Sequence, residues 1–154
     1  MKRSHALATS LVVAALAFAA TVGNASAETV EVHKAGGLYG GYEFLVASSG
    51  LTLYTFSKDK GSMTKKTREK CQKIKGCTEN WPPLIVTEAP TAGAGVNPAL
   101  LGTVTLRNGS QQVTYAGRPL YTNLGEEPFE VYYFGTKEFR GHWDGLMPSG
   151  GLIT

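Results

Sequence analysis

The chain has 154 residues, with 15 basic and 12 acidic side chains, 19 glycines and only two cysteines. This length allows one domain, or two very small ones, and excludes a large multidomain enzyme. Charged residues make up 18% of the chain, which is too few for a disordered polyelectrolyte, and two cysteines cannot build a disulfide-dense miniprotein or a zinc site made of cysteines alone. The composition is that of a small, glycine-rich globular domain.

The first 27 residues have the pattern of a cleaved export signal. Lys2 and Arg3 precede an apolar stretch, and Ala25-Ser26-Ala27 gives the small-x-small cleavage pattern. The alternative is a transmembrane anchor, but the apolar run is short for a span and no stop-transfer charges follow it at once. We expect cleavage after Ala27 and an exported domain over residues 28–154, periplasmic or secreted, with no membrane span after cleavage.

Short β-like runs dominate the exported part. Ser48-Ser49-Gly50 lies between two such runs and predicts a hairpin, and Asn108-Gly109 is typical of a type I′ hairpin turn. Residues 88–99 are expected to form a loop, and residues 64–74 one short helix or loop. Since no strong amphipathic helix is predicted, the fold class is all-β or β-dominated. The expected strands cover residues 29–33, 42–47, 51–56, 84–86, 103–106, 112–115 and 120–121.

Two segments of the chain, at about residues 50–59 and 117–126, resemble each other. Both contain Gly-x-x-Leu-Tyr-Thr, and an acid follows the tyrosine after five residues in each. We expect two related small antiparallel β units packed as one domain, because neither unit alone would bury enough core. Adjacent side chains on a strand face opposite sides, so the two leucines should face one layer and the two tyrosines the other.

The first of these segments contains the motif Tyr54-Thr55-Phe56-Ser57-Lys58-Asp59. Together with Cys71, the block Cys77-Thr78-Glu79-Asn80-Trp81-Pro82-Pro83-Leu84 and the block Arg107–Tyr121, it resembles a family of exported bacterial proteins. These are described as predicted lipoproteins with a Yx(F/W/Y)xxD motif, also called the secreted repeat of unknown function. The chain departs from the family in lacking a lipid-attachment cysteine and in its wider C-x5-C spacing. The resemblance implies a fold and no particular reaction.

The two cysteines, Cys71 and Cys77, are expected to form a disulfide, because an exported protein meets oxidising conditions. The alternative is a redox pair. The usual redox spacing is C-x-x-C in a βαβ context, and this chain has neither.

The aromatic motif has two interpretations. Tyr54 and Phe56 project to the same face of a strand, where their rings fill a core or line an aromatic platform. Asp59 follows the strand and can accept hydrogen bonds from turn N–H groups. The candidate binding or family-motif residues are Tyr54, Phe56, Asp59, Trp81 and Tyr121.

Basic residues concentrate between Lys58 and Lys75. This segment of 18 residues has eight basic and two acidic side chains, a net charge of +6. It is either a solvated segment that aids solubility or a surface for an anionic partner. Aromatic residues are not interleaved with these lysines, which argues against a nucleic acid as that partner.

Catalytic constellations are missing from the sequence. It has no Gly-x-Ser-x-Gly elbow and no phosphate-binding Gly-Lys-Ser/Thr loop, and the histidines left after cleavage, His33 and His142, do not make a metal site by themselves. We therefore expect no cofactor, no metal and no enzymatic activity. The sequence favours an exported cell-envelope protein with a binding or structural accessory role and an unknown ligand or envelope component as partner. The alternatives are a periplasmic metal or redox accessory protein and, as a third class, a hydrolase.

Overall fold

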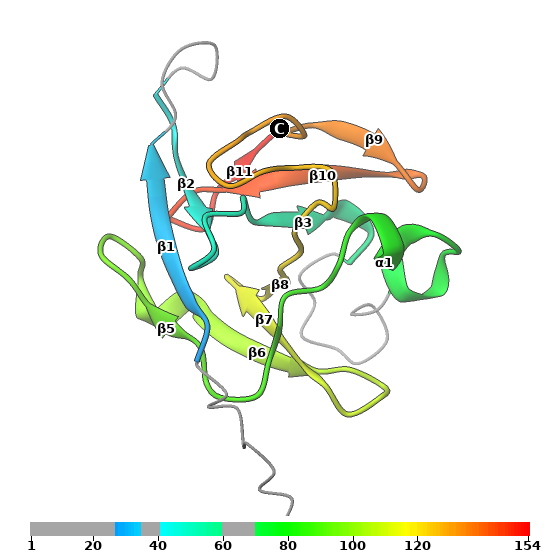
Figure 1. Cartoon of the computed structure of the whole chain (residues 1–154), viewed down its shortest axis with the longest axis horizontal. Helices are drawn as coiled ribbons and strands as arrows, with labels where there is room; N and C mark the ends of the chain where they lie inside the picture. The colour runs from blue at the N-terminus through cyan, green and yellow to red at the C-terminus, as the bar shows by residue number, and fades with distance from the viewer. Residues whose placement is uncertain (1–26, 35–40, 60–69) are drawn as a thin grey trace, which may run out of the picture.

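The computed structural model describes residues 27–34, 41–59 and 70–154, and these form the β-dominated fold expected from the sequence (Figure 1). The expected export signal lies outside the described residues except for Ala27, and so does the first part of the helix candidate, residues 64–69. Among the residues that the structure describes, no helix is long and apolar enough to cross a membrane.

The secondary structure consists mainly of short strands. One α-helix, α1 (Cys77–Asn80), and three 3-10 turns, Ser57–Asp59, Cys71–Lys73 and Pro98–Leu100, accompany them in the described chain. The strands are β1 (Thr29–Lys34), β2 (Glu43–Val46), β3 (Tyr54–Phe56), β4 (Ile85–Val86), β5 (Thr91–Ala92), β6 (Leu101–Thr105), β7 (Gln111–Tyr115), β8 (Arg118–Pro119), β9 (Thr136–Glu138), β10 (Gly141–Leu146) and β11 (Leu152–Ile153).

The strands form three small sheets. The first has the order β2-β1-β5, the second is built on β10, which pairs with β3, β9 and β11, and the third is built on β7, which pairs with β4, β6 and β8. All these pairs are antiparallel except β1 with β5, which is parallel. In Figure 1 the β10 sheet crosses the upper part of the molecule, β6 and β7 cross the lower part, and α1 lies at the side.

Isolated backbone bridges connect the sheets. Val46 at the end of β2 pairs with Thr52, just before β3. Tyr54 in β3 pairs with Tyr121, which follows β8 and also pairs with Pro83. Tyr121 therefore joins the second sheet to the third.

The core confirms the alternation predicted for the two similar segments. Leu53 and Leu120 are fully buried in one hydrophobic cluster, which also contains core side chains of the first and third sheets. Tyr54 and Tyr121 are fully buried in a second cluster, which is aromatic. The adjacent leucine and tyrosine of each segment thus face opposite layers, as the period of a strand requires.

The β6–β7 hairpin has a different turn from the predicted type I′. That turn needs positive φ at both central residues, and of the pair only Gly109, with φ 87°, has it. The Gly109 N–H donates to Leu106 O at 3.0 Å and the Leu106 N–H to Ser110 O at 2.8 Å, which makes a three-residue loop. The Asn108 side chain is held in this loop, because its Oδ1 accepts the Ser110 N–H at 3.0 Å.

Two further details correct the sequence prediction. The expected loop at residues 88–99 contains strand β5, which pairs with β1. In the strand expected at residues 84–86, β4 covers only Ile85–Val86, and Ile85 is 43% exposed, whereas Val86 is buried and Leu84 packs against the core. The described end of the segment expected to be one short helix or loop forms the 3-10 turn Cys71–Lys73, in agreement with that prediction, and the α-helix begins later, after Gly76 with φ 80°.

Candidate functional site

Tyr54 and Tyr121 pair directly through their backbones. The Tyr54 N–H donates to Tyr121 O and the Tyr121 N–H donates to Tyr54 O, both at 2.9 Å. The two similar segments of the chain therefore meet at the same residue of their shared motif.

Each tyrosine hydroxyl binds the acid that follows the other tyrosine. The Tyr54 hydroxyl donates to Glu126 Oε1 at 2.5 Å, and the Tyr121 hydroxyl donates to Asp59 Oδ2 at 2.6 Å. Asp59 lies five residues after Tyr54, and Glu126 lies five residues after Tyr121. The acids are thus exchanged between the two segments, and both hydrogen bonds are buried.

Burial raises the pKa of both carboxyl groups. Desolvation penalises the charged form of Glu126 and raises its pKa to about 7, although bonds from the Tyr54 hydroxyl and the Tyr132 N–H oppose the change. Desolvation likewise raises the pKa of Asp59, against the lowering effect of the Tyr121 hydroxyl and the Lys70 N–H. Burial and the neighbouring Glu126 also raise the pKa of Tyr54, so its hydroxyl stays neutral and donates.

Stacked rings surround these tyrosines. Trp81 and Trp143 are stacked with ring centroids 4.0 Å apart and planes 5° apart, and Phe56 stacks on Trp143 at 4.5 Å. Tyr54 forms a T-shaped pair with Trp81, with ring centroids 5.1 Å apart, and Tyr121 forms one with Trp143, with centroids 5.3 Å apart. Such aromatic contacts add about 0.5–1.5 kcal/mol each beyond the area they bury, so this cluster is a rigid part of the core.

The expected disulfide between Cys71 and Cys77 is present, with the two Cα atoms 5.3 Å apart. Both cysteines are fully buried in the aromatic cluster. The bridge therefore holds the intervening loop, residues 72–76, against the core.

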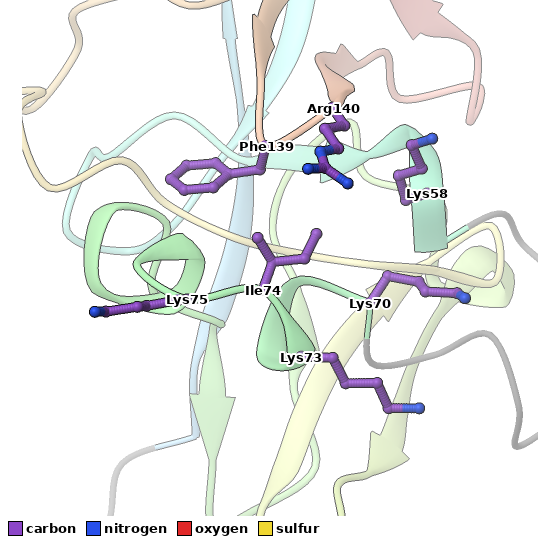
Figure 2. A pocket seen from close by; sticks show the side chains of 7 residues that line it. All are labelled: Lys58, Lys70, Lys73, Ile74, Lys75, Phe139 and Arg140. Atoms are coloured by element: carbon purple, nitrogen blue, oxygen red, sulfur yellow. The ribbon is translucent and has the colours of Figure 1, made fainter.

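A cationic pocket lies over this cluster (Figure 2). Its volume is about 620 Å³, and five of its seven lining residues are basic and none is acidic. The two apolar lining residues, Ile74 and Phe139, are half-buried and pack against the aromatic cluster. The lining residues are Lys58, Lys70, Lys73, Ile74, Lys75, Phe139 and Arg140.

Two half-buried hydrogen bonds hold the segments that carry these side chains. Asp59 Oδ1 accepts the Lys70 N–H at 2.9 Å, which places the start of the disulfide loop. The Trp81 indole N–H donates to Glu138 Oε2 at 2.8 Å and thereby ties the β9–β10 hairpin to α1. Asp59 thus performs the turn-binding role predicted from the sequence, and it also links the core tyrosine to the pocket.

The β9–β10 turn presents two of the lining residues in an unusual backbone conformation. Phe139 and Arg140, between Glu138 and Gly141, have φ 52° and 61°. Positive φ at both positions is the signature of a type I′ turn, in which Asn-Gly is preferred. Left-handed conformations of residues other than glycine cost about 1–3 kcal/mol each and occur most often at functional sites. Two residues other than glycine therefore hold this turn in a strained conformation.

The residues singled out from the sequence divide between the core and this pocket. Tyr54, Phe56, Asp59, Trp81 and Tyr121 come together in the aromatic core, each at most 2% exposed, and they do not line an open cleft. From the basic segment, four lysines line the pocket, whereas Lys60, Lys65, Lys66 and Arg68 lie outside the described residues.

Sequence reasoning missed Phe139 and Arg140. A Phe-Arg pair is not typical of a hairpin turn, and the two residues lie more than 60 positions after the basic segment. Within the described part of the chain, no three His, Cys, Asp or Glu side chains gather around a common point.

The comparison with known families agrees with the resemblance seen in the sequence. Residues 43–85 match the family model described as a secreted repeat of unknown function. The matched stretch contains β2, β3, the disulfide and the four pocket lysines. It therefore carries both the aromatic motif and most of the basic pocket. No curated protein and no solved structure matches the chain.

Proposed function

We propose that the chain is an exported, non-enzymatic binding domain of the cell envelope, and that its binding site is the cationic pocket. The observation that supports this function is that five of the seven residues lining a space of about 620 Å³ are basic and come from three separate segments. A cavity lined by one sign of charge attracts ligands of the opposite sign. The ligand of this site is therefore an anion.

The arrangement of the pocket supports binding more than solubility alone. Charges that serve only solubility stand apart in water, where repulsion between them is lowest. Here Lys58, the disulfide loop and the β9–β10 turn are held together by the disulfide and by bonds from Asp59 and Trp81. Holding like charges close is unfavourable without a counter-charge, and prior ordering of a site favours binding because less entropy is lost when the ligand arrives.

Export is supported by the match to a secreted repeat and by the disulfide, a bond of oxidising compartments. Mass spectrometry of protein recovered outside the cytoplasm should show Glu28 as the first residue, without an attached lipid. Recovery of a chain that still carries the apolar stretch before Ala25 would contradict export by a cleaved signal.

Anion binding is tested by titration calorimetry with inorganic pyrophosphate at low salt. We expect binding that weakens steeply as salt is added, because the pocket side chains are exposed to solvent. The double variant Lys70→Gln/Arg140→Gln should lower the affinity at least about tenfold. Lys137→Gln is the matched control, since Lys137 is exposed on the same hairpin but does not line the pocket. An equal loss in the control and the double variant would refute the site.

A further inference from the structure

Four of the five basic side chains of the cationic pocket lie on one side of it, and the fifth, Lys75, extends on the side of the Phe139 ring (Figure 2). In Figure 2 the side chains of Lys58, Lys70, Lys73 and Arg140 extend on one side of Ile74, and the Phe139 ring lies on the other. Ile74 and Phe139 are half-buried, whereas the four basic residues are exposed. The pocket therefore has a part with four basic side chains and an adjoining part in which the apolar Ile74 and Phe139 lie beside one lysine.

The charged part suits a ligand group with more than one negative charge. A single carboxylate would leave the four basic side chains of that side largely uncompensated. Arg140 offers a planar fork of N–H donors that fits phosphate oxygens, and lysine ammonium groups add point charges around it. A phosphate ester supplies up to two charges and three acceptor oxygens in one compact group.

The apolar part suits a ligand body attached directly to that group. The strained turn fixes Phe139 beside Arg140, and Phe139 also lies 3.7 Å from the position that a Cβ on Gly76 would take. The phenyl ring is thus anchored at the edge of the disulfide loop. A flat aromatic surface next to an anion site favours a ligand whose apolar group can cover the ring while its charged group meets the arginine.

We propose that the pocket binds a phosphate ester with an apolar body. Its phosphate lies among Lys58, Lys70 and Arg140, and its body covers Ile74 and Phe139. This inference rests on the proposed function and makes it more specific, because it names the charged group and requires a second, apolar part of the ligand.

The test compares phenyl phosphate with inorganic phosphate and benzoate on the full exported chain, by titration calorimetry at fixed pH and salt. Phenyl phosphate should bind at least about tenfold more tightly than either comparison compound, because each of these lacks one half of the ligand. Arg140→Gln should weaken binding of both phosphates. Phe139→Leu should remove the preference for phenyl phosphate and leave inorganic phosphate unchanged, and Lys137→Gln should change neither.

The outcomes separate this inference from the proposed function. If neither phosphate nor pyrophosphate binds, the anion site itself is refuted. If the anions bind but phenyl phosphate has no advantage over inorganic phosphate, or keeps its advantage in Phe139→Leu, the apolar half is refuted while the anion site stands. If benzoate bound as tightly as phenyl phosphate, the claim that the charged group of the ligand is a phosphate would be refuted.

The ester can be part of a lipid or a free molecule, and vesicles distinguish the two. Sedimentation with vesicles that contain phosphatidic acid, a phosphate monoester, but not with pure phosphatidylcholine vesicles, together with competition by phenyl phosphate, would identify a lipid headgroup. Binding of phenyl phosphate without retention on either vesicle would identify a soluble ester. Sedimentation that Arg140→Gln leaves unchanged would contradict the pocket as the binding site.

Discussion

Tyr54 and Tyr121 lie opposite each other in an antiparallel backbone bridge, and each sends its hydroxyl to the carboxylate that follows the other in the sequence. The two hydrogen bonds span 72 and 62 residues. Two similar short segments, far apart in the chain, are thus locked together by contacts that neither could make alone.

Tyr54→Phe and Tyr121→Phe should each lower the free energy of unfolding by about 1–3 kcal/mol, because each leaves a buried carboxyl group without its donor. The two losses should be similar, and urea unfolding measures both. Truncation to Ala would also remove the ring and should cost about 3–5 kcal/mol. Tyr132→Phe is the control, since its hydroxyl bond is exposed. A loss in only one of the two core variants would contradict the equivalence of the tyrosines.

Stability should fall with rising pH over the range in which Glu126 titrates. Burial raises its pKa from 4.5 to about 7, so the folded state holds this proton more tightly than the unfolded state. The resulting stabilisation is fully present below pH 4.5 and is lost as pH rises through about 7. Asp59 contributes with the same sign, because its pKa is also raised.

The Glu126→Gln variant isolates this effect. It keeps an acceptor for the Tyr54 hydroxyl but cannot ionise, so its unfolding free energy should decrease less between pH 4.5 and 7 than that of the unaltered protein. Glu127→Gln is the control, since Glu127 is exposed. The prediction fails if the pH dependence of Glu126→Gln follows that of the unaltered protein.

The double variant Cys71→Ala/Cys77→Ala should lower the unfolding free energy by about 2 kcal/mol, the value expected for closing so short a loop. It should also weaken pyrophosphate binding, because the loop that carries Lys70, Lys73 and Lys75 is no longer held in place by the disulfide. Thiol titration of the native, unreduced protein should find no reactive thiol. Two reactive thiols there would instead support the redox alternative.

Arg140→Gly should stabilise the protein by about 1 kcal/mol while it weakens anion binding. Glycine adopts the left-handed conformation of this turn without strain. Arg140→Gln is the matched control, because it removes the same charge and keeps the strained backbone. The melting temperature of Arg140→Gly should therefore be higher than that of Arg140→Gln, whereas titration calorimetry should give the same loss of anion affinity for both. An unchanged or lower melting temperature for Arg140→Gly would show that the turn is not strained.

Local patterns predicted those parts of the molecule that depend on neighbouring residues. The alternation of Leu53 and Tyr54 placed their side chains in opposite layers, and the spacing and export context of the two cysteines gave the disulfide. The exchange of acids was not predicted. The offset of five residues shows that an acid accompanies each tyrosine, but only the antiparallel pairing decides which tyrosine it binds.

The pocket was not predicted, for a similar reason. The sequence showed only the density of lysines on one side of it, since those residues lie close together in the sequence. Phe139 and Arg140 join them through the pairing of β10 with β3, in which Trp143 faces Phe56. This pairing depends on the whole β10 sheet. The two turn residues are also not of the types that are typical of a hairpin turn, so their conformation could not be predicted from the sequence.

The exchanged acids also limit how the chain can be divided. A polypeptide that ends in the stretch between β5 and β6 keeps Tyr54 and Asp59 but loses Glu126, and the complementary piece keeps Tyr121 and loses Asp59. Each piece on its own would bury a polar group without its counterpart, so neither should hold a native fold. Mixed in equal amounts, the two pieces have every donor and acceptor again, and a cut at this place should behave as a nick that the folded protein tolerates.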